Sequence, residues 1–237
     1  MSTDLKLRLH GIRNQSADLA RPLAQRAVPA GRARWVIGSR PAAELPLEAF
    51  LVSLGAVAIG EIGDKTQLLA LILAVRFRAP ISVLAGIFVA TIVNHALAAF
   101  AGTLIASWLT PGLLAWILAI SFILMGLWAL IPDEAPSEDA TAAATRFGPF
   151  IVTAVSFFLV EMGDKTQLAT VALGARYEAL LSVALGTTLG MMVANVPVVL
   201  SGNALAERIP AKAMRIAASL TFIALGLIGL ATALALA

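Results

Sequence analysis

The stretch EIGDKTQLL, residues 61–69, decides how this chain folds, because it places three charged side chains inside a run of apolar residues. Glu61, Asp64 and Lys65 stand where the neighbouring composition predicts hydrocarbon. A charged side chain near the centre of a bilayer costs about 2.5–3.5 kcal/mol on insertion scales. The stretch recurs as EMGDKTQLA at residues 161–169, so it belongs to the design of the whole chain.

The composition around both motifs is that of a membrane protein. Of 237 residues, 59% are hydrophobic and 13% are charged, and the mean hydropathy is +0.90. Apolar segments exceed the ~20 residues that a helix needs to cross a bilayer, and they are rich in the small residues that let helices pack closely in lipid. We predict an all-α membrane protein with six transmembrane helices, at residues 47–75, 81–106, 112–131, 148–174, 180–203 and 213–236.

Residues 1–46 differ in composition from the rest of the chain and are expected to form a basic, disordered tail. Eight of the seventeen Lys and Arg residues lie in the first 40 positions, whereas residues 49–237 carry nine basic and ten acidic side chains. The charge therefore predicts no nucleic-acid partner. The tail lacks the apolar core of a secretory signal. We expect a mis-annotated start, with translation beginning near Leu47; an organelle transit peptide is the alternative.

The chain repeats itself with a shift of one hundred residues. Residues 61–77 and 161–177 are identical at nine of seventeen positions. We predict a first three-helix repeat at 47–131, an acidic linker at 132–147 and a second three-helix repeat at 148–237. Each repeat has an odd number of spans, so the second would enter the membrane from the opposite side, as inverted repeats that meet near the midplane. Further identities one hundred residues apart begin at Ser82, Val83, Gly86, Gly102, Phe122, Ile123, Gly126 and Leu127.

Positive charges in the short loops predict the orientation. Loops that follow odd-numbered spans carry six Lys or Arg residues, whereas those that follow even-numbered spans carry only Arg176. Since cytoplasmic loops are enriched in Lys and Arg, this bias places the first group in the cytoplasm and both termini outside. The basic tail argues for the opposite orientation. The six residues are Arg76, Arg78, Arg146, Arg208, Lys212 and Arg215.

The charges of the paired motif point to a divalent cation. Its four carboxylates and two ammonium groups sum to −2, which one divalent cation would neutralise. Hard cations prefer oxygen ligands, and the absence of cysteine removes thiolate ligands. The ligands therefore favour Mn²⁺ or Ca²⁺ over Cu⁺ or Zn²⁺, and no cofactor is expected. The candidate metal ligands are Glu61, Asp64, Thr66, Gln67, Glu161, Asp164, Thr166 and Gln167.

Helical spacing gives the motif residues further expected roles. On one helix, Glu61 and Asp64 share a face. Lys65 and Lys165 follow the motif glutamates by four residues, the favourable order for a helical ion pair, and are expected to modulate the charge by holding the carboxylates apart. The motif glycines permit a local break that would free backbone carbonyls. Protons and metal compete for the same oxygens, which predicts metal/proton antiport.

Three polar residues within the predicted spans are secondary candidates. Asn94 and His95 lie in the second span, and Asn195 is equivalent to His95 one hundred residues later. A histidine within the membrane can relay protons or bind metal, but an interhelical hydrogen bond explains it equally well. Both interpretations stay open.

The motifs EIGDKTQ (61–67) and EMGDKTQ (161–167) closely resemble the E-x-G-D-K-[TS] signature of a cation/proton exchanger family. That family includes bacterial manganese exporters, chloroplast members and Golgi calcium/manganese–proton exchangers. The resemblance covers residues 47–237 and implies one two-fold-related site that exchanges Mn²⁺ or Ca²⁺ for protons. It is nearest to the bacterial manganese exporters, which implies a multi-pass protein of the bacterial inner membrane. It assigns the site to Glu61, Asp64, Lys65, Thr66, Glu161, Asp164, Lys165 and Thr166.

Other functions remain to be weighed against manganese export. A Ca²⁺/H⁺ antiporter needs the same oxygen ligands. An amino-acid or small-solute exporter could share the topology, but four inward carboxylates suit a metal better. The charges could also be ion pairs that only join helices. A membrane metalloprotease is disfavoured, because the chain lacks H-E-x-x-H. We therefore expect a secondary transporter and no enzyme; the sequence does not indicate an oligomeric state.

Overall fold

The computed structural model describes residues 44–132, 147–201 and 211–237. The chain divides into two units, Met1–Ser39 and Arg40–Ala237, and the described residues all belong to the second. The predicted tail at 1–46 and the predicted linker at 132–147 lie almost wholly outside the described residues. Two of the loop arginines used for orientation, Arg146 and Arg208, lie outside them as well.

The described residues form α-helices and contain no strand, in agreement with an all-α protein. In chain order the helices are α2 (Glu44–Glu61), α3 (Lys65–Phe77), α4 (Pro80–Trp108), α5 (Pro111–Trp128), α7 (Pro149–Glu161), α8 (Lys165–Tyr177), α9 (Leu180–Ser201) and α11 (Ala211–Leu236).

Several of these helices can cross a membrane. By length and composition α4, α5, α9 and α11 each qualify, and α2 with α3 qualifies as one span bent by 71°. α7 is a shorter apolar helix. Large apolar side chains cover the outside, with Ile81 82% and Trp108 77% exposed, which is the surface that lipid requires. The predicted continuous spans at 47–75 and 148–174 are wrong in one respect, because each is two helices that meet at the motif.

Glycine and aspartate produce both breaks. Gly63 and Gly163 have φ of +83° and +79°, a region that side chains with a Cβ rarely adopt. The next residues, Asp64 and Asp164, are extended N-caps with ψ of 168° and 165°. One helix therefore ends at the motif glutamate and another begins at the motif lysine. The prediction that Glu61 and Asp64 share a helix face is wrong for this reason.

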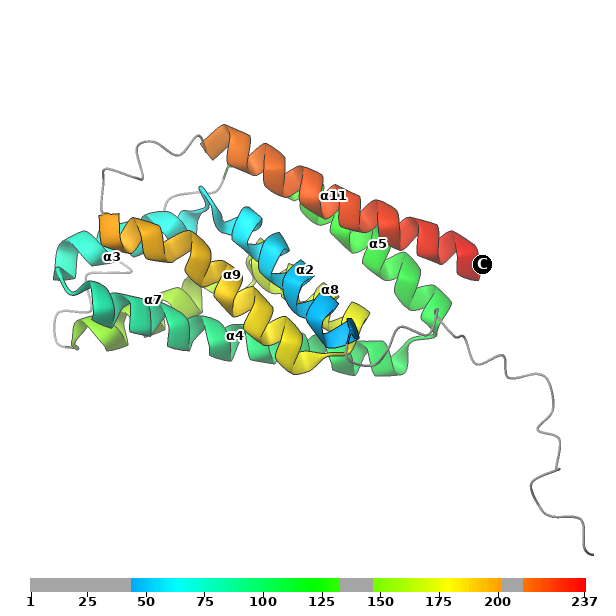
Figure 1. Ribbon diagram of the computed structural model, residues 1–237, viewed down its shortest axis with the longest axis horizontal. Helices are drawn as coiled ribbons and strands as arrows, with labels where there is room; N and C mark the ends of the chain where they lie inside the picture. The colour runs from blue at the N-terminus through cyan, green and yellow to red at the C-terminus, as the bar shows by residue number, and fades with distance from the viewer. Residues whose placement is uncertain (1–43, 133–146, 202–210) are drawn as a thin grey trace, which may run out of the picture. The chain divides into compact units, whose positions relative to one another are not determined.

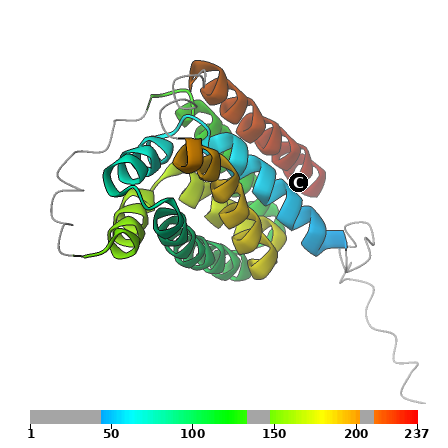
Figure 2. The same cartoon turned by 60° about the vertical axis from the view of Figure 1, so that its left-hand side comes forward.

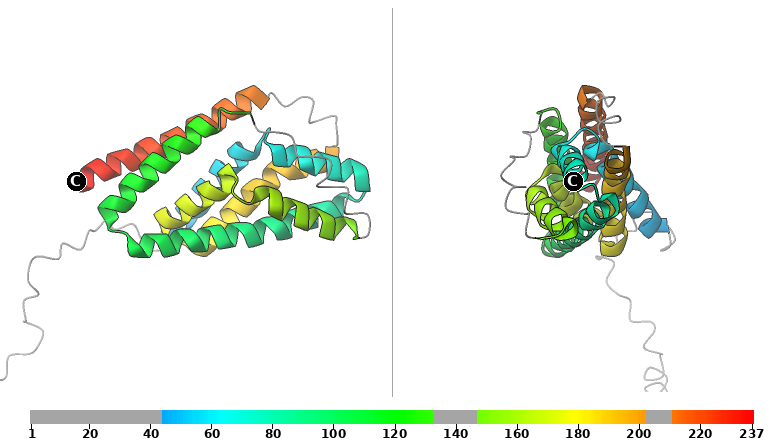
Figure 3. Two further views of the ribbon diagram at one scale, coloured as in Figure 1. Left: turned by 180° about the vertical axis from the view of Figure 1, so that it is seen from behind. Right: turned by 90° about the vertical axis from the view of Figure 1, so that its left-hand side faces the viewer.

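The helices pack in three main groups around the breaks. α2 lies along α9, α5 lies along α11, and α4 packs on α7, α8 and α9. Figure 1 shows α5 and α11 side by side, and the view from behind in Figure 3 agrees. Figure 2 shows α2 beside α9. Helices from the first and second halves of the chain are thus interleaved.

Contacts one hundred residues apart are equivalent. A Cβ on Gly86 would lie 2.8 Å from the carbonyl oxygen of Phe150, and a Cβ on Gly186 would lie 2.5 Å from that of Phe50. Because no Cβ fits in either place, glycine is what lets these backbones approach. The first contact joins α4 to α7, and the second joins α9 to α2. Each half therefore packs on the other through the same positions.

One pair of contacts is unequal. A Cβ on Gly174 of α8 would lie 2.6 Å from the carbonyl oxygen of Ala99, and a Cβ on Gly102 of α4 would lie 2.1 Å from that of Val171. The position equivalent to Gly174 is Ala74 of α3, which carries a Cβ. Consistently, α8 packs more extensively along α4 than α3 packs along α9.

Candidate metal site

Carboxylates from both motifs meet where the helices break. Glu61, Asp64 and Asp164 each offer an oxygen, and these oxygens lie within 4.8 Å of one another. Glu61 is fully buried and Asp164 is 2% exposed. Three oxygens at this spacing, in a site shielded from solvent, fit a hard divalent cation such as Mn²⁺ or Ca²⁺.

The fourth predicted carboxylate belongs to the same cluster. Glu161 is fully buried, and together with Asp164 it lies close enough to Glu61 to repel it electrostatically. The Oε1 atoms of Glu61 and Glu161 are buried and accept no hydrogen bond from any described residue. A buried acceptor without a donor costs about 1–3 kcal/mol. A bound cation or a proton would remove that cost.

The motif threonines hold the carboxylates. The hydroxyl of Thr66 donates a 2.5 Å hydrogen bond to Glu61 Oε2. The hydroxyl of Thr166 lies 3.3 Å from Glu161 Oε2 and 3.4 Å from Asp164 Oδ2, so it bridges two acids of its own motif. Both threonines are buried. They orient the acids and place hydroxyl oxygens beside the cluster.

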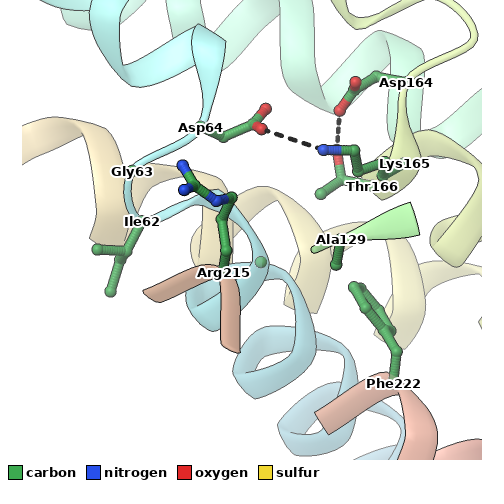
Figure 4. Close-up of a pocket in the computed structure, with 10 residues that line it drawn as sticks. Ile62, Gly63, Asp64, Ala129, Asp164, Lys165, Thr166, Arg215 and Phe222 are labelled. Atoms are coloured by element: carbon green, nitrogen blue, oxygen red, sulfur yellow. Dashed lines mark hydrogen bonds and ion pairs between the residues drawn. The ribbon is translucent and has the colours of Figure 1, made fainter. Parts of the chain in front are cut away.

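The lysines join one half of the chain to the other. Lys65 Nζ lies 2.8 Å from Asp164 Oδ1, and Lys165 Nζ lies 3.8 Å from Asp64 Oδ1 (Figure 4). Lys165 also lies over the ring of Trp128, 5.7 Å from its centroid. The break puts each motif glutamate and lysine on different helices, so their spacing is not that of the predicted helical pair.

The motif glutamines form hydrogen bonds to the backbone at the two breaks. Gln67 Oε1 accepts a hydrogen bond from the Gly63 amide at 2.9 Å, and Gln167 Oε1 accepts one from the Gly163 amide at 2.6 Å. Their Nε2 atoms reach the other half, with Gln67 donating to the Ala194 carbonyl at 2.9 Å and Gln167 donating to Asn94 Oδ1. In this arrangement the Oε1 atoms of both glutamines accept hydrogen bonds from backbone amides.

The helix ends contribute charge of their own. α3 and α8 begin at the breaks, so their positive dipole ends face the site, and Asp64 and Asp164 occupy their N-cap positions. An acidic group is favoured at a helix N-terminus. Interrupted membrane helices are a known way to build ion sites at the midplane.

The secondary candidates separate into two groups. Asn94 belongs to the hydrogen-bond network around the site, because its Oδ1 accepts a hydrogen bond from Gln167. Asn195 Nδ2 instead donates to the Met191 carbonyl at 3.0 Å, within its own helix. His95 is fully buried, and neither ring nitrogen has a hydrogen-bond partner among the described residues.

A pocket opens onto the cluster and contains residues that sequence reasoning did not assign to the site (Figure 4). Ala129 follows α5, while Arg215 and Phe222 come from α11. One signal was present in the sequence, since Arg215 is a charged residue inside a predicted span; it was counted only as a loop charge. The lining consists of Gly60, Ile62, Gly63, Asp64, Ala129, Asp164, Lys165, Thr166, Arg215 and Phe222.

Known proteins resemble the chain over most of its length. A Vibrio cholerae protein named "Putative manganese exporter" is 51% identical over 165 residues, which cover 69% of this chain and 81% of the relative. GDT1-like protein 5 of Arabidopsis thaliana is 30% identical over 227 residues, with 78% and 96% covered. A GDT1-like protein of Synechocystis is 27% identical over 198 residues, with 74% and 93% covered. No solved structure matches the chain significantly.

The family model of the divalent cation/proton antiporter GDT1 matches residues 49–137 and 149–236. These two segments contain both motifs and most of the described helices. The chain therefore belongs to the GDT1 family of divalent cation/proton antiporters.

Proposed function

We propose that this chain exports Mn²⁺ in exchange for protons at the carboxylate cluster. One observation carries the proposal: Glu61, Asp64 and Asp164, drawn from two distant motifs, bring oxygens within 4.8 Å of one another. Such a group of buried acids is costly unless it binds a cation or protons. The proposed ligands also include Glu161 and the hydroxyls of Thr66 and Thr166.

The proposed exchange uses the same oxygens for both ions. A divalent cation displaces protons from the carboxylates when it binds, and protons displace the cation when it leaves. The two ion pairs that join the halves of the chain, Lys65 with Asp164 and Lys165 with Asp64, supply positive charge beside the acids. Lys65 Nζ lies 2.8 Å from Asp164 Oδ1, and in the proposed cycle Lys65 gives up this partner as the cation enters. Lys165 does the same with Asp64.

For the architecture we propose six spans in two inverted three-helix repeats. In this scheme α2 with α3, and α7 with α8, are each one broken span. The equivalent contacts of Gly86 with Phe150 and of Gly186 with Phe50 support a two-fold relation between the halves. In Figure 1, α2 and α7 start at opposite ends of the bundle. Such a relation lets one central site open to either side in turn.

We place the protein in the inner membrane of a bacterial cell, as a transporter rather than an enzyme. The Lys and Arg bias of the loops supports cytoplasmic connections between α3 and α4 and between α9 and α11. In this orientation both termini are outside, and Mn²⁺ enters the site from the cytoplasm.

Calcium is the second candidate ion, because carboxylate and hydroxyl oxygens also suit Ca²⁺. Manganese is preferred, because the relative with 51% identity is named "Putative manganese exporter". Competition separates the two ions. With Mn²⁺ as the substrate, a tenfold excess of Ca²⁺ should leave most of the transport intact; strong inhibition by Ca²⁺ would favour the calcium assignment.

The test of export uses a bacterium that lacks its own manganese exporter. Cells are challenged with MnCl₂, and cellular manganese is measured for wild type, Glu61→Gln and Asp164→Asn, with Glu178→Gln as a control for an exposed carboxylate outside the site. Wild type and Glu178→Gln should lower cellular manganese, and the two site variants should not. Equal manganese in all strains, with each protein present in the membrane, would reject manganese export.

Proton coupling is tested in everted membrane vesicles. Uptake of Mn²⁺ should rise when the vesicle lumen is made acidic and collapse when an ionophore dissipates the pH gradient. A flux that ignores the gradient would reject antiport while leaving metal transport in place.

A further inference from the structure

Arg215 reaches the carboxylate site from outside both motifs. It lies in the second turn of α11 and lines the same pocket as Asp64 and Asp164. Figure 4 shows its guanidinium directed towards Asp64. Within the part of the chain that the structure describes, Arg215 has no ion-pair partner. Among the described residues, a cationic group without an ion-pair partner therefore faces a cluster of acids.

This charge is present in only one half of the chain. The motif lysines occur as an equivalent pair, Lys65 and Lys165, and each has a carboxylate partner. The position equivalent to Arg215 is Ala115, a buried residue of α5. Among the described residues, a positive charge from outside the motifs therefore lines the pocket on the α11 side, so the described parts of the two sides differ electrostatically although the motifs match.

We propose that Arg215 is a tethered cation that competes with the transported metal for the carboxylates, with Asp64 as its main partner. The proposal rests on the proposed function, because it assumes that a divalent cation binds the cluster. With Arg215 included, the formal charges of four carboxylates, two lysines and one arginine sum to −1. A bound divalent cation changes the sum to +1, so Arg215 weakens metal binding and favours release.

Proton exchange cannot remove this competition. Arginine keeps its charge at physiological pH, whereas carboxylates gain and lose protons. Arg215 must therefore move its side chain, or α11 must move, each time the metal binds. Its flexible aliphatic stem permits such a movement, and α11 contacts both α5 and α2. Arg215 would thereby couple release of the metal to the position of α11.

The test measures Mn²⁺ binding to the full chain in lipid nanodiscs, by the electron paramagnetic resonance signal of free Mn²⁺. Arg215→Gln should bind Mn²⁺ about tenfold more tightly than wild type, because the repulsion between Arg215 and the metal is lost. Arg215→Lys keeps the charge and should stay within about twofold of wild type. Lys212→Gln removes an equal charge from an exposed position of the same helix and should bind like wild type.

A structural role would give a different result. In proteoliposomes, Arg215→Gln should lower both the half-saturating Mn²⁺ concentration and the maximal rate, because release becomes slower. A packing defect would not tighten binding. Arg215→Met preserves the aliphatic stem, carries the same expectations and replaces Arg215→Gln if that variant is not recovered folded.

Two failures are distinguishable. If wild type binds Mn²⁺, Glu61→Gln does not, and the folded Arg215→Gln and Arg215→Met proteins bind no more tightly than wild type, then the role of Arg215 is refuted and the proposed function stands. If wild type itself binds no Mn²⁺, both proposals are refuted.

Discussion

The two helix breaks have the same backbone conformation but different surroundings. Gly63 and Gly163 have nearly equal φ angles, and the N-caps after them agree closely in φ and ψ. Yet the side chain of Lys65 is 23% exposed, whereas that of Lys165 is 7% exposed. Asp64 is half-buried and Asp164 is buried.

Neighbouring helices also pack differently in the two halves. α8 is held against α4 through Gly102 and Gly174, whereas α3 presents Ala74 at the equivalent place. The repeated motif therefore has the same local backbone in both halves, whereas the packing and the exposure of individual side chains differ. In an exchanger, reversing that difference would move the access of the site from one side to the other.

The largest expected effect tests whether both halves are needed. Glu61→Gln and Glu161→Gln should each reduce Mn²⁺ transport by at least about 100-fold, since loss of a ligand should exceed the 10–100-fold typical of groups around a metal site. The reductions should be equal although the two breaks differ in exposure. Transport assays in vesicles, with Glu178→Gln as the control, measure this. Substantial transport by only one of the variants would show that the halves contribute unequally.

The two ion pairs that join the halves of the chain should differ in strength. A double-mutant cycle of Lys65→Met and Asp164→Asn should give a coupling energy of about 1.5–3 kcal/mol, as expected for a hydrogen bond between charged groups. The pair of Lys165 and Asp64, at 3.8 Å, is beyond hydrogen-bond distance and should give a smaller coupling energy. Unfolding in mixed micelles supplies the energies. Equal couplings would mean that the two halves hold their lysines alike.

The packing of α8 on α4 should depend on one missing methyl group. Gly174→Ala should lower the free energy of unfolding by about 1–3 kcal/mol, because its Cβ would meet the carbonyl of Ala99 at 2.6 Å. Ala74→Gly is the matched change in the first half and relieves no such contact; it should cost only the ~1 kcal/mol of a helical Ala→Gly change. If Gly174→Ala costs no more than Ala74→Gly, packing at this position does not explain the asymmetry.

The smallest effect concerns the caps of α3 and α8. Arg78 and Glu178 have φ of +49° and +50°, which disfavours a residue with a Cβ. Arg78→Gly and Glu178→Gly should each stabilise the protein by about 1 kcal/mol, and by the same amount in both halves. Arg78→Ala and Glu178→Ala remove the same charges without relieving the strain, so they serve as controls in thermal unfolding. A stabilisation as large in the alanine variants would assign the effect to charge.

Much of this molecule could be predicted from its sequence, because hydropathy and an exact repeat are strong local signals. They located the apolar segments and the eight motif residues, four of which are the carboxylates that the structure brings into one cluster. The breaks were less predictable. Gly63 indicates only that a break is permitted. Helical spacing without a break predicts that Lys65 pairs with Glu61, whereas in the structure Lys65 pairs with Asp164.

Long-range partners could not be predicted at all. The packing of α4 against the breaks determines that Gln167 bonds to Asn94. The packing of α11 likewise determines that Arg215 faces Asp64. No periodicity in a single sequence records which helix lies beside which. For the same reason the unequal burial of two identical motifs was not visible before the structure.

The interrupted helices have a consequence for water. The last turns of α2 and α7 end in the interior, and although the Glu61 and Glu161 carbonyls accept hydrogen bonds from Asp64 and Asp164, other carbonyls of a last helical turn lack partners within the helix. Lipid tails cannot satisfy them. We therefore expect water to enter the pocket that Gly60, Gly63 and Asp64 line. Such water would carry protons to the acids directly, without a chain of titratable side chains.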